Sequence, residues 1–172
     1  PVLKENLAHY WMLYDKWSRY EPETRGVLVA YASIYGGTAE AARRLASMLR
    51  EQGAGEVVLF DLTRHDVSYA VAEAFRLSHM VLCSVTYDGG VFPAMHSFID
   101  HLASKSLRNR VVGIMENGSW APVAGRLMCD AVSRMKGMTV LEPMVTLHSR
   151  LHPADMPAMV ELSRAICETS LC

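Results

Sequence analysis

Short apolar runs alternate with segments of helical periodicity along most of the chain, and this alternation restricts the fold more than any other feature. The five apolar runs are rich in β-branched residues and lack the in/out alternation of a half-exposed strand, which indicates strands buried on both faces. They read GVLVAYAS, EVVLFDL, HMVLCSV, RVVGIME and TVLEPMVTL. Apolar positions recur every three or four residues in the segments 38–52, 66–77, 91–104, 122–136 and 153–168. Five strands alternating with five helices predict an α/β fold with a doubly wound parallel sheet.

Size, charge and cysteine usage narrow the class of protein. With 172 residues and 51% hydrophobic content the chain suits one globular domain, and its 17 basic and 18 acidic residues form no dense basic stripe for nucleic acid. No apolar run approaches the ~20 residues of a membrane-spanning helix, and no signal peptide or lipidation motif is visible. The four cysteines show no CxxC pairing, and Cys83 lies inside an apolar run. We therefore expect a cytoplasmic setting with neither nucleic acid nor membrane as partner.

Residues 1–25 stand outside the alternation and carry an unusual aromatic load. The aromatic residues are Tyr10, Trp11, Tyr14, Trp17 and Tyr20. Helical spacing relates Leu3, Leu7, Tyr10, Tyr14 and Trp17. This arm either packs on its own domain or docks on a neighbour, and the sequence leaves both open. We divide the chain into the arm, 1–25, and one domain, 26–172.

The stretch YASIYGGTAEAA joins the first predicted strand to the first predicted helix. Gly36 and Gly37 permit backbone conformations closed to other residues, and Thr38 is a candidate helix cap. Successive amide N–H groups and the helix dipole then converge on one point, which suits an anion. The chain lacks GxxxxGK[ST], and it lacks GxGxxG with an acidic residue at the next strand end, which disfavours triphosphates and dinucleotides.

A phosphate monoester held by neutral donors is the ligand that this first loop predicts. The predicted contacts are Ser33, Ile34, Tyr35, Gly36, Gly37 and Thr38. The alternative is an ordinary glycine-rich turn with a capping threonine.

Two further glycine-containing loops follow the third and fourth predicted strands, SVTYDGGVFP and ENGSWAP. Their aromatic residues, Tyr87 and Trp120, predict a planar heterocycle gripped between two rings. The predicted contacts are Thr86, Tyr87, Asp88, Gly89 and Gly90 on one side and Asn117, Gly118, Ser119 and Trp120 on the other. Alternatively, Tyr87 is a rim residue and Trp120 anchors its helix to the core. Asp88 and Glu116 are expected near the ring, where they would disfavour negative charge on it, or else as a turn residue and a solvated strand-end charge.

These loops resemble the flavodoxin-like family, whose first loop binds the phosphate of FMN and whose second and third loops enclose its isoalloxazine ring. The match is closer to the carboxyl-terminal domain of A-type flavoproteins, also called flavodiiron proteins. It is carried by YDKWSRYEPE, YASIYGGTAEAA, TYDGGVFP with the later FIDHL, and NGSW. The resemblance implies a flavodoxin-like sheet of order 2-1-3-4-5 with helices on both faces, and FMN as cofactor. Two departures are Gly37, where the family usually has Asn, and ENGSWAP in place of SYGWSG.

The same resemblance implies a function. In that family an amino-terminal metallo-β-lactamase-like domain carries a di-iron site that reduces oxygen or nitric oxide, and FMN relays electrons to it. The iron-ligand pattern HxExDH is absent here, and the seven histidines form no convincing metal set. By this resemblance the chain is the electron-transfer part of an FMN-dependent oxidoreductase, without catalytic residues or metal of its own, and residues 1–25 are the linker from the di-iron domain. A rubredoxin-like or NAD(P)H-linked reductase would donate electrons, and a homodimer is allowed.

Two other classes of function remain open at this stage. One is a free-standing flavodoxin-like electron carrier or NAD(P)H/quinone oxidoreductase. The other is a cofactor-free interaction or signalling module. A signalling receiver needs paired acidic residues after the first strand and an Asp at the end of the third. Ala32 and Ser33 occupy the former region and Thr86 follows the latter, which disfavours the receiver.

Overall fold

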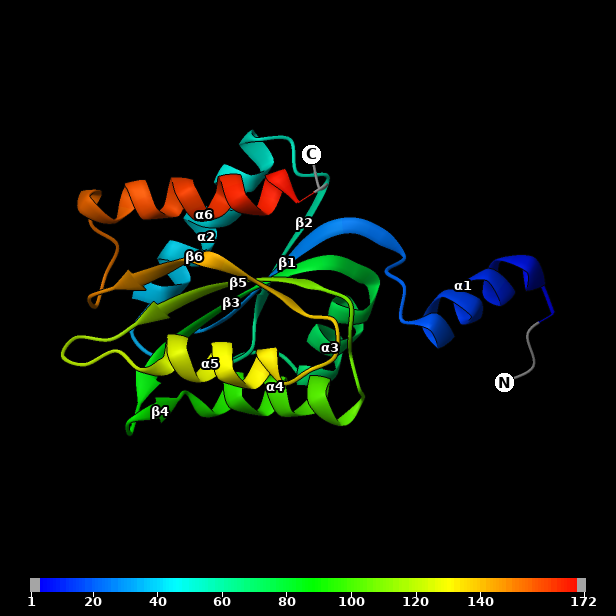
Figure 1. The fold of residues 1–172 in the computed structure, drawn as a ribbon, viewed down its shortest axis with the longest axis horizontal. Coiled ribbons are helices and arrows are strands. Elements are labelled where there is room, and N and C mark those ends of the chain that lie inside the picture. Colours follow the sequence, from blue (N-terminus) through cyan, green and yellow to red (C-terminus); the bar gives the residue numbers. More distant parts are fainter. Residues whose placement is uncertain (1–3, 170–172) are drawn as a thin grey trace.

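A twisted parallel sheet forms the centre of the computed structural model, which describes residues 4–169 (Figure 1). Its strands are β1 (Thr24–Ala32), β2 (Glu56–Asp61), β3 (Leu77–Tyr87), β5 (Val111–Asn117) and β6 (Thr139–Leu147). They pair in the order β2-β1-β3-β5-β6, and every one of these pairs is parallel. A two-residue strand, β4 (Gly90–Val91), pairs antiparallel to the end of β3. With this short strand left aside, the predicted order 2-1-3-4-5 is confirmed.

Helices cover both faces of the sheet, as the alternation of the sequence predicts. They are α2 (Gly37–Glu51) and α6 (Met156–Glu168) on one face, and α3 (Val67–Arg76), α4 (Pro93–Ser104) and α5 (Ala124–Ser133) on the other (Figure 1). A short 3₁₀ turn, η1 (Pro153–Asp155), precedes α6. The boundaries differ from the predicted ones by a few residues. Thr24, for example, already pairs with Leu77, two residues before the predicted start of the first strand.

The two faces of β1 pack into two separate cores. Val27, Val29 and Tyr31 belong to the core under α2 and α6. Leu28 and Ala30 belong to the core under α3, α4 and α5. All five are at most 6% exposed, which confirms that the central strand is buried on both sides. Cys83 on β3 is fully buried, and burial raises the pKa of its thiol, as expected of a small hydrophobe.

The position of β1 determines where a ligand can bind. The chain leaves β1 for β2 on one side of it, and returns to pair β3 on the other. The loops that follow β1 and β3 therefore diverge to opposite faces of the sheet. In sheets of this kind the crevice between such loops, beyond the carboxyl ends of the strands, is the usual ligand site.

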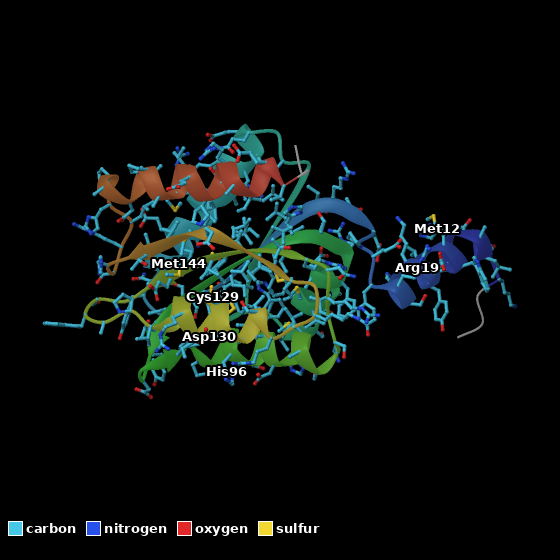
Figure 2. The ribbon with its side chains drawn as sticks, in the orientation of Figure 1. Met12, Arg19, His96, Cys129, Asp130 and Met144 are labelled. Atoms are coloured by element: carbon cyan, nitrogen blue, oxygen red, sulfur yellow. The ribbon has the colours of Figure 1, made fainter. Side chains whose placement is uncertain are left out.

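A helix at the amino-terminal side, α1 (Leu7–Arg19), stands apart from the sheet (Figure 1). None of its residues is buried, and Figure 2 shows Met12 and Arg19 on this separate helix, away from Cys129 and Asp130 on α5. Large apolar side chains on it are exposed, among them Trp11 at 76% and Tyr14 at 68%. The predicted helical arm is thus present from Leu7, whereas Leu3 lies outside the described residues.

The root of the arm is attached to the body through Tyr20. Its ring lies 6.0 Å from that of Phe75, and the guanidinium of Arg108 lies 4.0 Å above it. The hydroxyl of Tyr20 donates to the carbonyl of Lys105 at 3.3 Å. The arm therefore contacts its own domain at its end, while the helix itself is uncovered by the described residues.

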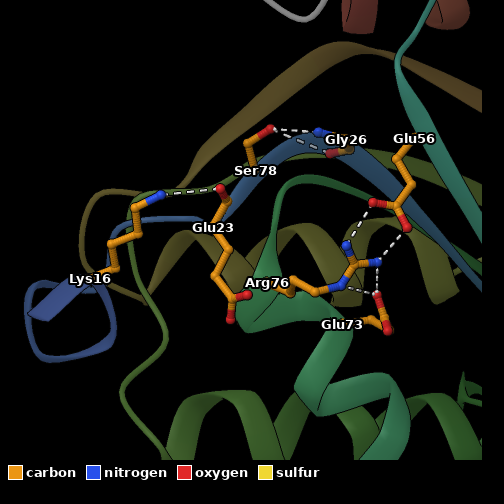
Figure 3. A network of polar contacts seen from close by, with 7 residues as sticks. All are labelled: Lys16, Glu23, Gly26, Glu56, Glu73, Arg76 and Ser78. Atoms are coloured by element: carbon orange, nitrogen blue, oxygen red, sulfur yellow. Dashed lines mark hydrogen bonds and ion pairs between the residues drawn. The ribbon is translucent and has the colours of Figure 1, made fainter. Parts of the chain in front are cut away.

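An ion-pair network lies beside this root (Figure 3). The guanidinium of Arg76 donates to both carboxylate oxygens of Glu56, at 2.6 and 2.7 Å, and to Glu73. Hydrogen bonds from Arg76 lower the pKa of the Glu56 carboxyl. Because Arg76 ends α3 and Glu56 begins β2, the network joins the end of that helix to the start of the edge strand. The nearby Lys16 donates to the backbone carbonyl of Glu23.

Arg110 is the largest fully buried side chain of the described residues. It has no carboxylate partner within residues 4–169, and its hydrogen bonds all go to backbone carbonyl oxygens. These belong to Tyr20, Ala74, Phe75, Arg108 and Asn109, at 2.7 to 3.2 Å. Two of the acceptors lie at the carboxyl end of α3, where the helix dipole favours a cation. Burial lowers the pKa of Arg110 to about 10, so the guanidinium is still charged at neutral pH.

Replacing this arginine tests how much the buried cation stabilises the junction. In Arg110→Met the five carbonyl groups lose their donor inside the protein, and we expect the free energy of unfolding to fall by about 3 kcal/mol. Urea unfolding followed by circular dichroism measures the change. The control is Arg108→Met, which loses only the partly exposed contact with Tyr20 and should cost about 1 kcal/mol or less. Equal losses in the two variants would contradict the role given to Arg110.

Candidate functional site

The three predicted loops meet around one cavity at the carboxyl edge of the sheet. Its volume is about 600 Å³. The predicted residues that line it are Ser33, Ile34, Tyr35, Gly37, Thr38, Thr86, Tyr87, Asp88, Gly89, Asn117, Gly118, Ser119 and Trp120. Gly36 and Gly90 lie in the same loops but do not line the cavity. Val85, Ala121 and Ser149 line it as well, and sequence analysis missed them.

The loop after β1 leaves its backbone donors available. The N–H of Gly36 donates to the hydroxyl of Ser33 at 3.1 Å, and the N–H of Glu40 to the carbonyl of Gly36 at 2.9 Å. No described residue accepts a hydrogen bond from the N–H groups of Ile34, Tyr35, Gly37 or Thr38. These groups stand at the amino end of α2, whose dipole favours negative charge. We call this group of donors the anion cradle.

The start of α2 differs from the prediction that Thr38 is the cap. Gly36 is the residue before the helix, with φ of 93°, a left-handed conformation that suits glycine, and no side chain caps the helix. Thr38 is already inside the first turn and only 2% exposed. Its hydroxyl oxygen accepts a hydrogen bond from the side-chain amide of Asn117 at 3.2 Å. The prediction of Thr38 as cap is therefore wrong, because the residue before the helix is Gly36, two positions earlier.

Asn117 connects the loop after β6 to the rest of the site. Its Oδ1 accepts from the backbone N–H of Ser149 at 2.9 Å, and its Nδ2 donates to the carbonyl of Ser149 at 2.9 Å. The hydroxyls of Ser119 and Ser149 lie 2.7 Å apart. Ser149 has φ of 74°, so these contacts hold it in a left-handed conformation. Asn117 lines the cavity, but its amide is occupied by protein atoms and positions a fourth loop.

Gly37 permits this fourth loop to approach. A Cβ at this position would overlap the carbonyl oxygen of Ser149 and come within 3.3 Å of the Cα of Arg150. An asparagine at position 37, as the resembling family usually has, would meet the same atoms. Here the amide beside Thr38 comes instead from Asn117. The fourth loop could have been anticipated, because the fifth predicted strand also ends at this edge and is followed by the polar stretch HSR.

Polar side chains at the ends of β3 and β5 hold the start of α5. The hydroxyl oxygen of Thr86 accepts from the N–H groups of Val123 and Ala124, at 3.0 and 3.1 Å. The carboxylate of Glu116 accepts from the N–H of Gly125 at 2.7 Å and from the hydroxyl of Thr146 at 3.0 Å. Glu116 is 4% exposed and does not line the cavity. The expectation that Glu116 is a solvated charge is therefore wrong, and its side chain holds the start of α5 without lining the cavity.

The loop after β3 is a tight hairpin. Tyr87 pairs with Gly90, and the two residues between them, Asp88 and Gly89, have φ of 48° and 68°. Positive φ at both central residues is the pattern of a type I′ turn, which Asp-Gly favours. The ring of Tyr87 packs edge-on against Phe92, with centroids 5.6 Å apart, and the side chain is 45% exposed.

Two other aromatic side chains at the cavity are almost completely exposed. Trp120 is 97% exposed and Tyr35 is 98% exposed. The alternative in which Trp120 anchors its helix to the core is therefore wrong. Both rings belong to residues that line the cavity, so they can cover a planar ligand without breaking a packed contact.

Metal-binding and membrane-spanning features are absent from the part of the chain that the structure describes. Within residues 4–169 no group of three or more His, Cys, Asp or Glu side chains is placed to hold a metal ion. His96 on α4, for instance, lies 3.1 Å from Asp100 on the outer surface. Over the same range no helix combines the length and apolar character needed to cross a membrane.

Comparison with known proteins supports the fold. No protein-family model and no curated protein matches the sequence. The rubredoxin oxygen:oxidoreductase of Desulfovibrio gigas superposes with a TM-score of 0.87 at 18% identity, over 94% of this chain and 40% of its own. The flavodiiron protein of Giardia intestinalis gives 0.80 at 17%, over 98% and 43%. A flavodoxin from the domain Archaea gives 0.72 at 18%, over 84% and 97%.

The chain thus has the flavodoxin-like fold, and it spans about two fifths of the length of the flavodiiron proteins that it resembles. The resemblance predicted from the three loops is confirmed at the level of the fold. Residues 24–172 make up less than nine-tenths of the chain, so alignments over 94% and 98% of it reach into α1. The alignment to the archaeal flavodoxin is short enough to lie within residues 24–172.

The close approach at Gly37 can be tested by adding one methyl group. In Gly37→Ala the new Cβ displaces the loop at Ser149 and strains its hydrogen bonds with Asn117, and we expect the free energy of unfolding to fall by about 2 kcal/mol. Urea unfolding measures the loss. Gly55→Ala is the matched control, because a Cβ there meets its nearest atom at 3.4 Å and should change stability by at most about 0.5 kcal/mol. A Gly37→Ala protein as stable as its parent would refute the tight contact.

Proposed function

We propose that the chain is an FMN-binding electron-transfer domain. The observation that carries the proposal is the anion cradle: four backbone N–H groups without a protein acceptor belong to residues that line a cavity, and exposed aromatic residues line the same cavity. The N–H groups before and in the first turn of a helix have no acceptor within the helix, and the helix dipole favours negative charge there, so an anionic ligand can supply the acceptor. A phosphate monoester supplies several acceptor oxygens at one point.

The residues around the cavity divide into two groups by the part of FMN they would hold. The anion cradle and the hydroxyls of Ser33 and Thr38 would hold the phosphate. Residues 86–90 and 117–120 would line the two sides of the ring system. FMN supplies the redox chemistry when it is bound, and the chain contributes placement and electrostatics. No protein nucleophile or general base is required for this role.

The cavity contains little formal charge. Asp88 is the only ionisable acid or base among its lining residues other than the tyrosines, and it sits in the turn of the hairpin. A carboxylate at this rim would disfavour additional negative charge on a bound ring.

The hydroxyl of Thr86 and the amide of Asn117 are already used to hold neighbouring loops. The binding site is therefore preorganised by protein contacts that do not depend on the ligand.

We place this domain in an electron relay of the flavodiiron type. In this proposal residues 1–25 are the linker and residues 26–172 the FMN domain, and the electrons pass from a rubredoxin-like or NAD(P)H-linked reductase to a di-iron site on a metallo-β-lactamase-like domain. The parent protein would reduce oxygen or nitric oxide in the cytoplasm. Two findings support this placement: the flavodiiron alignments reach into α1, and the similar Desulfovibrio gigas protein is a rubredoxin oxygen:oxidoreductase.

A free-standing flavodoxin-like carrier or NAD(P)H/quinone oxidoreductase is the second candidate function. It is favoured by the flavodoxins, 97% of whose length aligns with this chain. The arm distinguishes the two candidates, because an exposed aromatic helix is expected in a linker to another domain and is not needed by a free-standing carrier.

FMN binding is the direct test of the proposal. Titration of the protein with FMN and with riboflavin, followed by flavin fluorescence, should give an affinity at least about a hundredfold higher for FMN, because only FMN places a phosphate in the anion cradle. Bound FMN should also colour the protein yellow. Equal affinities for the two flavins, or no binding, would overturn the proposal.

The role of the exposed tryptophan gives a second measurement. Trp120→Ala should weaken FMN binding about fivefold to tenfold, which corresponds to about 1 kcal/mol of stacking. Tyr69→Ala is the control, because Tyr69 is 68% exposed on α3 and does not line the cavity. It should leave the affinity unchanged.

The relay and the free-standing enzyme differ in turnover. We expect the FMN-loaded chain, given NADH or NADPH and a quinone, to show no steady turnover unless a separate reductase is added. Sustained oxidation of the nicotinamide without a reductase, measured by absorbance, would favour the second candidate instead.

A further inference from the structure

A second hollow, which we call the outer groove, adjoins the cavity beside the anion cradle. Its volume is about 770 Å³, and it is more open to solvent than the cavity. The two share Tyr35, Gly37 and Ser149. Gly37 and Ser149 are in close backbone contact, which separates the two hollows on one side. A group attached to a phosphate in the anion cradle would therefore enter the outer groove beside the exposed ring of Tyr35.

The outer groove is lined by cationic side chains. Arg43 on α2 and Arg150 after β6 line it, and neither forms an ion pair with a described residue. The side chain of Arg43 also interacts with the hydroxyl of Tyr31 on β1. His148 and His152 lie along the same wall, and Glu40 is the one carboxylate among the lining residues. The two guanidinium groups thus outnumber the acidic group. This charge contrasts with the cavity, whose lining contains no arginine, lysine or histidine.

The boundary between the two hollows carries an aromatic ring. Tyr35 lines both and is 98% exposed, with no ring contact to any described residue. Because this ring is exposed, it can stack on a heterocycle in the groove without losing a contact that it already makes. Cations for a phosphate and a ring for a base are the two components that a nucleotide requires.

We propose that the outer groove accepts the second phosphate and the adenosine of FAD, so that this chain binds the flavin dinucleotide as well as FMN. The proposal rests on the proposed function, because the flavin and its first phosphate occupy the cavity and the anion cradle. The second phosphate lies between Arg43 and Arg150, and the adenine stacks on Tyr35. The volume of the outer groove lies within the range of about 300 to 1,000 Å³ that is typical of small-molecule sites.

This proposal revises the expectation that dinucleotides are disfavoured. That expectation rests on the missing GxGxxG motif, in which a helix N-terminus binds the pyrophosphate and an acidic residue binds the ribose. The outer groove works differently, since its cations come from the middle of one helix and from a loop about a hundred residues later in the chain. No contiguous motif records such a site.

The test compares FMN and FAD on the same protein. In the unmutated chain, titration followed by flavin fluorescence should give affinities for FMN and FAD within about tenfold of each other. Arg43→Ala and Arg150→Ala should each weaken FAD binding about fivefold to tenfold and change FMN binding by less than about twofold, because only FAD places a phosphate between them. Arg44→Ala is the matched control: it removes a cation from the same helix, paired with Glu51 and outside the outer groove.

Salt gives an independent measurement. The affinity for FAD should fall more steeply than that for FMN as ionic strength rises, and the difference should disappear in the Arg43→Ala/Arg150→Ala double variant. All the replaced side chains are exposed, and circular dichroism confirms that each variant is folded.

The results separate the two levels of the proposal. Two results would overturn the role of the outer groove and leave the proposal of FMN binding standing. One is an affinity of the unmutated chain for FAD more than about a hundredfold below that for FMN. The other is an equal loss of affinity for FMN and FAD in the arginine variants. Absence of binding by either flavin would overturn the proposed function, and the role of the outer groove with it.

Discussion

The simultaneous parallel pairing of β1 with β2 and β3 is the constraint on which the site depends. Because the chain changes direction across the sheet at β1, the loops after β1 and β3 part to opposite faces, and a crevice opens between them. The pairing of β3 with β5 and of β5 with β6 brings two more loops to the same edge. Burial of β1 on both faces fixes this register, since a shift by one residue would exchange its two apolar cores.

The polar groups at that edge have two different tasks. Side chains such as Asn117, Thr86 and Glu116 bind the loops to one another. Backbone N–H groups of residues 34, 35, 37 and 38 are left for a ligand. Because side-chain contacts hold these loops in place, the neutral donors have fixed positions before a ligand binds. Little conformational entropy is therefore lost when an anion binds. The arginines outside the anion cradle add charge without entering it.

Local patterns in the sequence were sufficient for the fold and for three of the four loops. The β-branched runs and the helical periodicity determined the elements, and the glycine pairs marked the loops after β1 and β3. The contacts between distant residues were not accessible in this way. Asn117 meets Ser149 and Thr38 across more than thirty and seventy residues, and Glu116 is buried by groups on α5 and β6. The start of α2 at Gly37 depends on the left-handed conformation of Gly36, which the sequence permits without requiring.

The buried guanidinium of Arg110 has a consequence for the mechanics of the amino-terminal helix. It donates a hydrogen bond to the backbone carbonyl of Tyr20, directly after α1. The guanidinium of Arg108 stacks on the ring of the same residue. Helix α1 is thus attached to the domain at its carboxyl-terminal end. Its direction relative to the sheet is set at this end, by the contacts of Tyr20 and by the hydrogen bonds of Lys16 and Trp17 to Glu23, whose backbone N–H in turn donates to the carbonyl of Arg76.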